Sequence, residues 1–324
     1  MLDAGGWTDT WFAATGFVCN LAVDDGAEVT VERASRATDG NHVELVVPAF
    51  DEHYEFAPSE PPGRHPLLEA TLRRWALPNE PLRVTVASGV PPGAGLGTSA
   101  SVVVALIVAL DAASGTARDA MSLAVAAHEI ETVELGLESG IQDQIAAACG
   151  GGNLITIEPY PDATVRALTI APAMWNALSD RLLTVYLNAP HDSDAVHRAV
   201  IERVGAAEHA DAFAALRTAA RRAADALEAG DIDAYGEAMI ANTAAQALLH
   251  PALVSPRARD MIDVAKRAGA IGWKVNGAGG DGGTVTIITP EDATILRAKL
   301  AKQPGLTVLS LRPTRHGANV IDQD

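Results

Sequence analysis

The sequence predicts an α+β fold with two domains, and three observations support this prediction. Segments with strand patterns follow one another in runs, whereas a doubly wound parallel sheet would need strands and helices to alternate strictly. The 324 residues exceed the length of one typical domain, and a hydrophobic content of 48% can fill a large core. The longest apolar run, 102–110, is too short to span a membrane. We therefore expect two globular domains, 1–172 and 173–324.

The first domain is expected to begin with strands and to continue with helices. Alternating or apolar β-rich segments predict strands at 16–23, 27–34, 41–50 and 81–90, with a short helix at 65–77 between the last two. Longer helices are then predicted at 99–113, about 117–135 and 141–149, the last ending in a glycine-rich segment. A hairpin is predicted from the segments 153–159 and 165–170.

The second domain is expected to open with an alternating strand at 181–187. Three helical stretches follow between Ala195 and Ala268. The remainder, 271–312, is predicted as strand, glycine loop, strand, helix and strand.

Charge and cysteine content disfavour several classes of protein. The chain has 24 Lys and Arg against 41 Asp and Glu, a formal net charge of −17, which disfavours nucleic acid or an anionic membrane as partner. A phosphate-bearing ligand must then be held by local groups such as loop amides, helix N-termini or a metal. Two cysteines, Cys19 and Cys149, and the absence of a signal-peptide pattern fit a cytoplasmic protein without a disulfide scaffold.

A glycine-rich turn at 91–97, in "PPGAGLGTSAS", runs directly into the apolar helix. The amides of a first helical turn lack intrahelical partners, and glycine lets the backbone close around a phosphate, so this segment is a candidate anion site. It lacks the lysine of a Walker A loop, and the spacing of Gly93, Gly95 and Gly97 is not that of a dinucleotide fingerprint. A capped helix after a tight turn is the alternative.

A second glycine loop, 276–283, lies between two predicted strands. Glycine fills five of the seven positions 277–283, which is dense for a plain hairpin and indicates close approach of the backbone to another group. A flexible turn is the alternative.

Four segments, in the order of the family's motifs, resemble the GHMP kinases. The segment 91–101 resembles their phosphate-binding motif, 272–283 their third motif, and 3–10 ("DAGGWTDT") their first motif in its sugar-kinase form. The segment 138–153 ("ESGIQDQIAAACGGGN") resembles the stretch with the catalytic aspartate. The pairing of first and third motifs is closest to the fucokinase and heptose 7-phosphate kinase branch. The resemblance implies an N-terminal nucleotide-binding α+β domain and a C-terminal ferredoxin-like α+β domain.

The resemblance also implies ATP and Mg²⁺ as cofactors. Asp143 would accept or orient the proton of the acceptor hydroxyl, although an acidic residue that favours the helix dipole is the alternative. Ser99 and Glu131 would bind Mg²⁺, and only its spacing to Asp143 selects Glu131 over three neighbouring glutamates. The nucleotide phosphates would be wrapped by Pro92, Gly93, Ala94, Gly95, Leu96, Gly97, Thr98, Ser99 and Ala100.

For the sugar, the resemblance implies that Asp9 binds hydroxyl groups, with an Asx-turn as the alternative. The chain departs from the family at 11–12, where Trp-Phe replaces Pro-Pro and would reshape the sugar pocket, and at Asp281, which brings a negative charge where glycine is common. The residues expected to contact substrate are Trp7, Thr8, Asp9, Gly140, Gly277, Gly279 and Gly280.

In the family, a strand that ends in arginine runs directly into the first motif. Counting back from Asp9 passes Met1 before this arginine is reached. We therefore expect the strand and its arginine to be missing here, and the natural protein to begin upstream.

The expected function is ATP-dependent phosphorylation of a sugar hydroxyl, most simply the anomeric hydroxyl of a hexose, deoxyhexose or heptose, with or without a phosphate. The partner would be a small-molecule sugar, and the protein a monomer or homodimer. One alternative is a non-catalytic sugar or nucleotide sensor, which Asp281 and the missing strand would suit. Another is a mevalonate-pathway kinase or decarboxylase, against which the sugar-type first motif argues.

Overall fold

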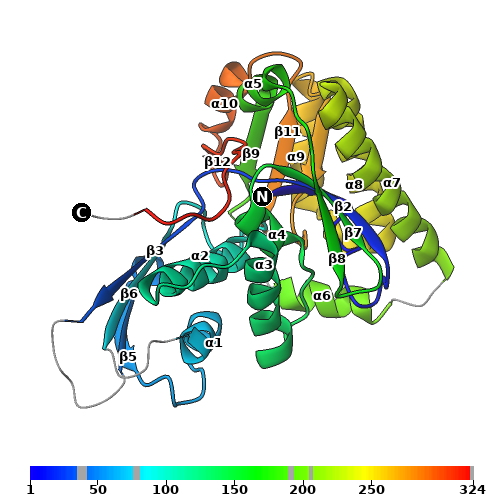
Figure 1. The fold of residues 1–324 in the computed structure, drawn as a ribbon. Helices are drawn as coiled ribbons and strands as arrows, with labels where there is room; N and C mark the ends of the chain where they lie inside the picture. Colours follow the sequence, from blue (N-terminus) through cyan, green and yellow to red (C-terminus); the bar gives the residue numbers. More distant parts are fainter. Residues whose placement is uncertain (35–41, 76–80, 189–192, 204–206, 322–324) are drawn as a thin grey trace.

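The computed structural model describes residues 1–34, 42–75, 81–188, 193–203 and 207–321, and its strands form three four-stranded sheets within these ranges (Figure 1). The predicted α+β class is confirmed. All pairings are antiparallel except β4 with β6. The sheet orders are β3(Ala27–Arg33)-β6(Leu82–Ser88)-β4(Val43–Val47)-β5(Glu52–Phe56), β1(Leu2–Ala4)-β2(Gly16–Leu21)-β7(Gly152–Ile157)-β8(Ala163–Ala167) and β10(Gly272–Val275)-β11(Thr284–Ile288)-β9(Leu182–Tyr186)-β12(Thr307–Leu309).

The helices cover and connect these sheets. They are α1(Pro66–Trp75), α2(Thr98–Ala113), α3(Ala120–Glu129), α4(Gln142–Cys149), α5(Pro172–Arg181), α6(Ser193–Ile201), α7(Ala207–Ala229), α8(Ile232–Leu249), α9(Pro256–Arg267) and α10(Thr294–Leu300). Short 3₁₀ turns lie at Pro48–Phe50 and Pro251–Leu253, and a π-helical turn at Ile130–Glu134 follows α3. In the described part of the chain, no helix has the length and apolarity needed to cross a membrane.

Helix α2 is apolar around most of its circumference because it packs on two sides. Val103 and Ile107 belong to a cluster with residues of α3 and α4, whereas Leu106 and Leu110 pack with the strands β4 and β6. A helix buried on two faces has no room for the polar stripe of a surface helix. This packing fixes the N-terminus of α2, and with it the first glycine loop, in the middle of the molecule (Figure 1).

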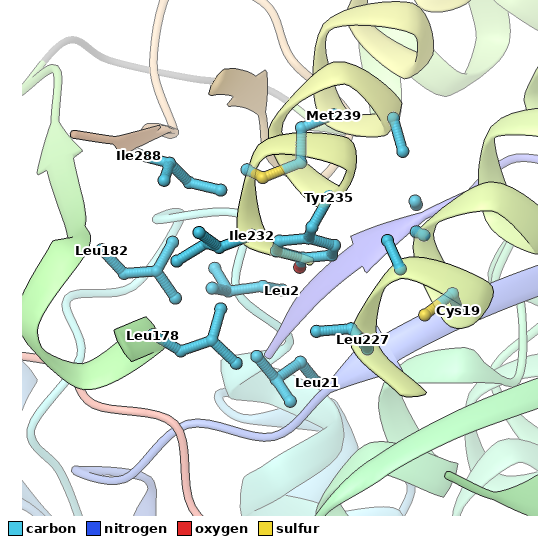
Figure 2. Packing of buried hydrophobic residues seen from close by; sticks show 14 of the residues in the cluster. Leu2, Cys19, Leu21, Leu178, Leu182, Leu227, Ile232, Tyr235, Met239 and Ile288 are labelled. Carbon is cyan, nitrogen blue, oxygen red and sulfur yellow. The ribbon is translucent and has the colours of Figure 1, made fainter. Parts of the chain in front are cut away.

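One core cluster joins segments from both predicted domains. Figure 2 shows Leu2 and Leu21 of the β1–β2 pair facing Tyr235 of α8 and Ile288 of β11. Helices α7 and α8 approach closely, since the facing positions are largely alanine. The boundary at residue 172, the first residue of α5, stays a prediction.

The structure corrects several expected elements. The strand β5, "EHYEF", was not predicted because three of its five residues are charged or imidazole side chains and none is fully buried. Helix α5 was also missed. The helix expected at 117–135 begins at Ala120, because the Asp119 carboxylate accepts a hydrogen bond from the Ser122 amide and caps it, and it ends in the π-helical turn.

Two further corrections concern the helices of the second domain and the strand at the first motif. Four helices, α6 to α9, occupy the stretch where three were expected. The expectation of a missing first strand is wrong insofar as Leu2–Ala4 form β1, which pairs antiparallel with Cys19–Leu21 of β2.

Candidate active site

The first glycine loop leaves the N-terminus of α2 open. Gly93, Gly95 and Gly97 have φ values of +75°, +69° and +76°, a region that favours glycine. Gly97 is the residue before the helix and has no side chain that could cap the first turn. The amides of a first helical turn lack intrahelical partners and bind phosphate in many proteins. Thr98 and the exposed Ser99 begin the helix.

The two glycine loops contact each other through their backbones. A Cβ built on Gly277 would lie 2.6 Å from the Cα of Gly95, and one on Gly95 would lie 3.0 Å from the Asn276 carbonyl oxygen. The Thr284 hydroxyl donates to the carbonyl of Ala94 at 3.0 Å. These contacts explain glycine at both positions and bring the phosphate-binding and third motifs together.

Gly279 and Gly280 of the second loop contact the segment that follows α8. A Cβ on Gly279 would lie 2.0 Å from the Leu253 carbonyl oxygen, and the Gly280 amide donates to the Ala252 carbonyl at 3.0 Å. This side of the loop therefore rests on the turn between α8 and α9. Asp281 is exposed. The roles of these glycines toward a substrate stay predictions.

Asp143 lies against the first glycine loop. It sits in the first turn of α4, and a Cβ added to Gly97 would come within 3.0 Å of its Cγ atom. Burial raises the pKa of Asp143 to about 6, the α-amino group of Met1 and the ammonium of Lys274 lower it, and the charge of Asp3 raises it. A carboxylate with this pKa is ionised at neutral pH and poised to take a proton.

Asp9 is almost fully buried beside Asp143. Its Oδ2 atom accepts a hydrogen bond from the Gln142 amide at 3.1 Å, and a Cβ on Gly140 would lie 2.0 Å from the same oxygen. Gly140 is thus required for the position of this carboxylate. Burial raises the pKa of Asp9 to about 7, and the charge of Asp143 adds to the rise.

The neighbouring residues of the first motif face the protein. The Thr8 hydroxyl is buried within hydrogen-bond distance of the carbonyls of Gly5 (2.7 Å) and Phe17 (3.0 Å), so it fixes the loop around Asp9. Trp7 has a φ of +76° and its ring meets the His197 ring edge-on, with centroids 4.9 Å apart.

Glu131 lies in the π-helical turn, a feature that often marks functional sites. Burial raises its pKa to about 7, and the charge of Asp143 contributes, so the two carboxylates share one region. Its Oε1 atom has no hydrogen-bond partner within the described residues, nor do the buried Thr98 Oγ1 and Asn276 Oδ1 atoms. Unpartnered buried polar atoms on three segments of one site indicate a polar ligand there.

These residues fit Mg²⁺ together with a nucleotide. Among the described residues, no group of three or more His, Cys, Asp or Glu side chains could hold a metal by itself. Mg²⁺ commonly takes one or two protein oxygens and completes its shell with phosphate oxygens and water. The Glu131 carboxylate and a hydroxyl of the first turn of α2 would be such ligands.

Sequence reasoning missed a buried ion pair at the base of the site. The Lys274 Nζ atom donates to Oδ1 of Asp3 at 2.9 Å, and the exposed fractions of the two residues are only 1% and 6%. Oδ2 of Asp3 accepts from the Gly6 amide at 3.2 Å, and Asn242 Oδ1 accepts from the Gly5 amide at 2.7 Å. The pair therefore ties the first motif to β10. A lysine inside the strand "GWKV" was the available signal.

Asp9→Asn is expected to change the pH dependence of stability. Because the pKa of Asp9 is raised to about 7, the folded protein retains a proton that the unfolded chain releases above its pKa of 3.8. The resulting stabilisation is complete below pH ~4 and is lost as the pH rises to about 7, by up to ~4 kcal/mol. Urea unfolding between pH 4 and 7.5 should therefore show Asp9→Asn gaining stability relative to the wild type. Asp281→Asn, at an exposed carboxylate, is the control, and a constant difference for Asp9→Asn would contradict the expectation.

Two family models match the chain. The model "GHMP kinases N terminal domain" matches residues 66–151, and "GHMP kinases C terminal" matches residues 223–305. The first range contains the first glycine loop, Glu131 and Asp143, and the second contains Lys274 and the second glycine loop. Together the two ranges cover just over half of the chain.

Related sequences include two kinds of sugar kinase. The chain is 25% identical over 218 residues to D-glycero-alpha-D-manno-heptose 7-phosphate kinase of Campylobacter jejuni, covering 67% of this chain and 64% of the relative. It is 28% identical over 240 residues to the galactokinase of Mycobacterium tuberculosis, covering 64% of each. The match thus spans slightly less than two thirds of these relatives' length.

Solved structures show the same fold over nearly the whole chain. A D-glycero-D-manno-heptose 1-phosphate kinase from Bacteroides thetaiotaomicron superposes with a TM-score of 0.75 at 21% identity, covering 97% of this chain and 94% of that chain. Lactococcus lactis galactokinase complexed with galactose superposes with a TM-score of 0.69 at 16% identity, covering 97% and 92%. The matched family models, the order of the motifs and this shared fold lead to one conclusion: the chain belongs to the GHMP kinase family.

Proposed function

We propose that the protein transfers the γ-phosphoryl group of ATP to a hydroxyl group of a sugar. The observation that carries this proposal is the position of Asp143 against Gly97, at the point where the glycine loop enters α2. A proton acceptor and a set of phosphate-binding amides thereby lie at one place. Phosphoryl transfer depends mainly on positioning and on neutralising charge, and this arrangement supplies the first requirement.

The position of each residue in the site suggests its role in the reaction. The amides of the first loop and of the α2 N-terminus would bind phosphate oxygens of ATP. Asp143 would orient the acceptor hydroxyl and take its proton. Asp9, held by the Gln142 amide, would accept hydrogen bonds from other sugar hydroxyls. Bound Mg²⁺ would neutralise charge on the transferring phosphate, with Glu131 and Ser99 or Thr98 as its protein ligands.

A sugar as the acceptor is supported by the related sequences. Both relatives compared above are named as kinases of sugars or sugar phosphates. The first motif of this chain also has the sugar-kinase form, and its Asp9 is buried in the site.

The test is ADP release measured with a coupled assay in the presence of MgATP and a panel of free and phosphorylated sugars, with mevalonate as the non-sugar acceptor. We expect sugar-dependent ADP release that Asp143→Asn abolishes. Release with mevalonate alone, or equal release by wild type and Asp143→Asn, would overturn the proposal. Binding of ATP and sugar without ADP release would instead support the sensor alternative.

Gly97→Ala is expected to lower kcat by about tenfold or more, because the new Cβ must displace the Asp143 carboxyl group from the phosphate loop. Gly115 follows the other end of α2, has a φ of +69°, and has no atom within 4 Å of an added Cβ. Gly115→Ala therefore carries the same backbone strain, roughly 1 kcal/mol, without the contact. Steady-state kinetics and melting temperatures of both variants separate the two effects. Equal kcat values in the two variants would contradict the placement of Asp143.

Glu131→Ala is expected to raise the Mg²⁺ concentration needed for half-maximal rate by about tenfold or more, since Mg²⁺ would lose its carboxylate ligand. Glu134 lies in the same π-helical turn, but it is exposed and pairs with Arg74 at 3.3 Å. Glu134→Ala is therefore the matched control and should behave as the wild type. Mg²⁺ titration of the initial rate checks both variants, and equal shifts would remove Glu131 from the metal site.

A further inference from the structure

A small, partly open recess lies beside Gly140, whose backbone packs on the Asp9 carboxylate, and its composition bears on the acceptor. It is formed by the loop after Asp9, the segment 138–140 and one face of α6. Gly140, whose backbone packs on Asp9, lies in its wall. The lining residues are Trp7, Thr10, Trp11, Phe12, Glu138, Ser139, Gly140, His197 and Ile201. An acceptor that contacts Asp9 on the side of Gly140 would have this recess beside it.

One side of the recess is aromatic. The Trp11 ring is 53% exposed, and its indole N–H donates to Oε2 of Glu138, which fixes the ring's position. The rings of Trp11 and Phe12 meet edge-on with centroids 5.5 Å apart, and Phe12 packs on Phe213. A supported aromatic face that stays exposed suits the C–H face of a sugar ring, which is apolar while its hydroxyls point sideways.

The charge of the recess is unfavourable for an anion. Of its lining residues, all of which lie in the described part of the chain, none is Lys or Arg, and Glu138 contributes a negative charge. Two cations near the first motif bind protein groups: Arg217 donates to the carbonyls of Ala13 and Thr15, and Lys274 donates to Asp3. Arg198, which follows His197 on α6, does not line the recess. The Gln142 amide at the N-terminus of α4 is taken by Asp9.

A phosphomonoester needs the opposite environment. It carries close to two negative charges at neutral pH and is held in proteins by Arg or Lys side chains or by unoccupied helix N-termini. Beside the Glu138 carboxylate it would meet a like charge, which repels it. The recess therefore suits an uncharged sugar better than a sugar phosphate.

Resting on the proposed function, we infer that the acceptor is an unphosphorylated sugar, whose apolar face stacks on Trp11 and whose hydroxyls are read by Asp9 and Glu138. This distinguishes the chain from relatives that are named for heptose phosphates. The replacement of Pro-Pro by Trp11-Phe12 then has a function, because it supplies the aromatic wall.

The first experiment compares hexoses and heptoses with their terminal phosphomonoesters, and includes free 6-deoxyhexoses, by coupled ADP release and, without nucleotide, by saturation-transfer NMR. We expect the best free sugar to exceed its phosphomonoester at least 100-fold in kcat/KM and to bind detectably. A phosphomonoester that is the better substrate overturns the inference and leaves the proposed function standing. A free sugar that binds but is not phosphorylated supports the inference and overturns the proposed function. Absence of both binding and turnover overturns both.

Two variants test the assigned groups. Trp11→Ala should raise KM for the sugar at least tenfold and leave KM for ATP unchanged, whereas Phe50→Ala, at another exposed aromatic residue (52%), should change neither. Glu138→Arg should increase kcat/KM for the phosphomonoester at least tenfold, and Glu134→Arg makes the same charge change outside the recess and should not. An unchanged sugar KM in Trp11→Ala, or equal effects of Glu138→Arg and Glu134→Arg on kcat/KM for the phosphomonoester, would count against this recess as the sugar site.

Discussion

Asp143→Asn is expected to lower kcat by about 10²-fold or more while the affinity for ATP stays close to that of the wild type. The asparagine keeps the shape of the side chain against Gly97 but can neither attract the acceptor proton nor take it up. Its distance from the phosphate-binding amides is unchanged, so the nucleotide site stays intact. Steady-state kinetics with ADP release, together with nucleotide binding by calorimetry, measure the two quantities separately.

Stability provides the control for this variant. Burial raises the pKa of Asp143 to about 6, so its ionised form is disfavoured in the folded protein. Replacement by a neutral amide should therefore leave the free energy of unfolding at pH 8 equal to or above that of the wild type. A loss of kcat with retained or increased stability assigns the effect to chemistry. Wild-type kcat in Asp143→Asn would remove this carboxylate from the mechanism.

Local patterns in the sequence predicted much of the fold. The glycine turn and the helix after it depend on residues close in the chain, and the structure places them at 91–97 and at Thr98–Ala113 as expected. The same applies to the strands β3 and β6, whose apolar residues alternate, and to β2, which is mostly apolar and buried. β5 could not be found in this way, because its side chains are mostly polar and its place is set by pairing with β4.

The site was predictable only in part, because its assembly depends on contacts distant in sequence. Asp143 and Glu131 were identified through resemblance to the family, since neither residue has a local pattern that separates it from a surface carboxylate. Gly279 appeared to belong to a ligand loop, and its close contact is the carbonyl of Leu253. Trp11 appeared only as a departure from the family, and its partner Glu138 is 127 residues away.

The pair Asp3–Lys274 is the extreme case, because its members are 271 positions apart in the sequence. Nothing local to "LDA" or "GWKV" specifies a partner, because a buried ion pair is selected by tertiary packing. The structure shows the two residues together, and from this the effect of the pair on Asp143 can be inferred. Lys274 lowers the pKa of Asp143 and Asp3 raises it, so both members of the pair act on the pKa of the proposed catalytic carboxylate.

Lys274→Met is expected to destabilise the protein by about 3–5 kcal/mol, because it leaves the Asp3 carboxylate buried without its cation. Urea unfolding measures this loss. The control is Arg74→Met, which removes an ion pair with Glu129 and Glu134 at the surface and should cost less than about 1 kcal/mol. The double variant Asp3→Asn/Lys274→Met removes both charges and should recover part of the stability. A cost for Lys274→Met no greater than that for Arg74→Met would show that the buried pair does not stabilise the fold.

The same variants should move the pH profile of kcat in opposite directions. Removing the Lys274 cation raises the pKa of Asp143, so the acidic limb of the profile should move to higher pH in Lys274→Met. Removing the Asp3 anion lowers that pKa, so the limb should move to lower pH in Asp3→Asn. The double variant, in which the two changes oppose each other, should lie between them. A purely structural pair would lower stability without moving the limb, and shifts of equal sign in both single variants would contradict the electrostatic link to Asp143.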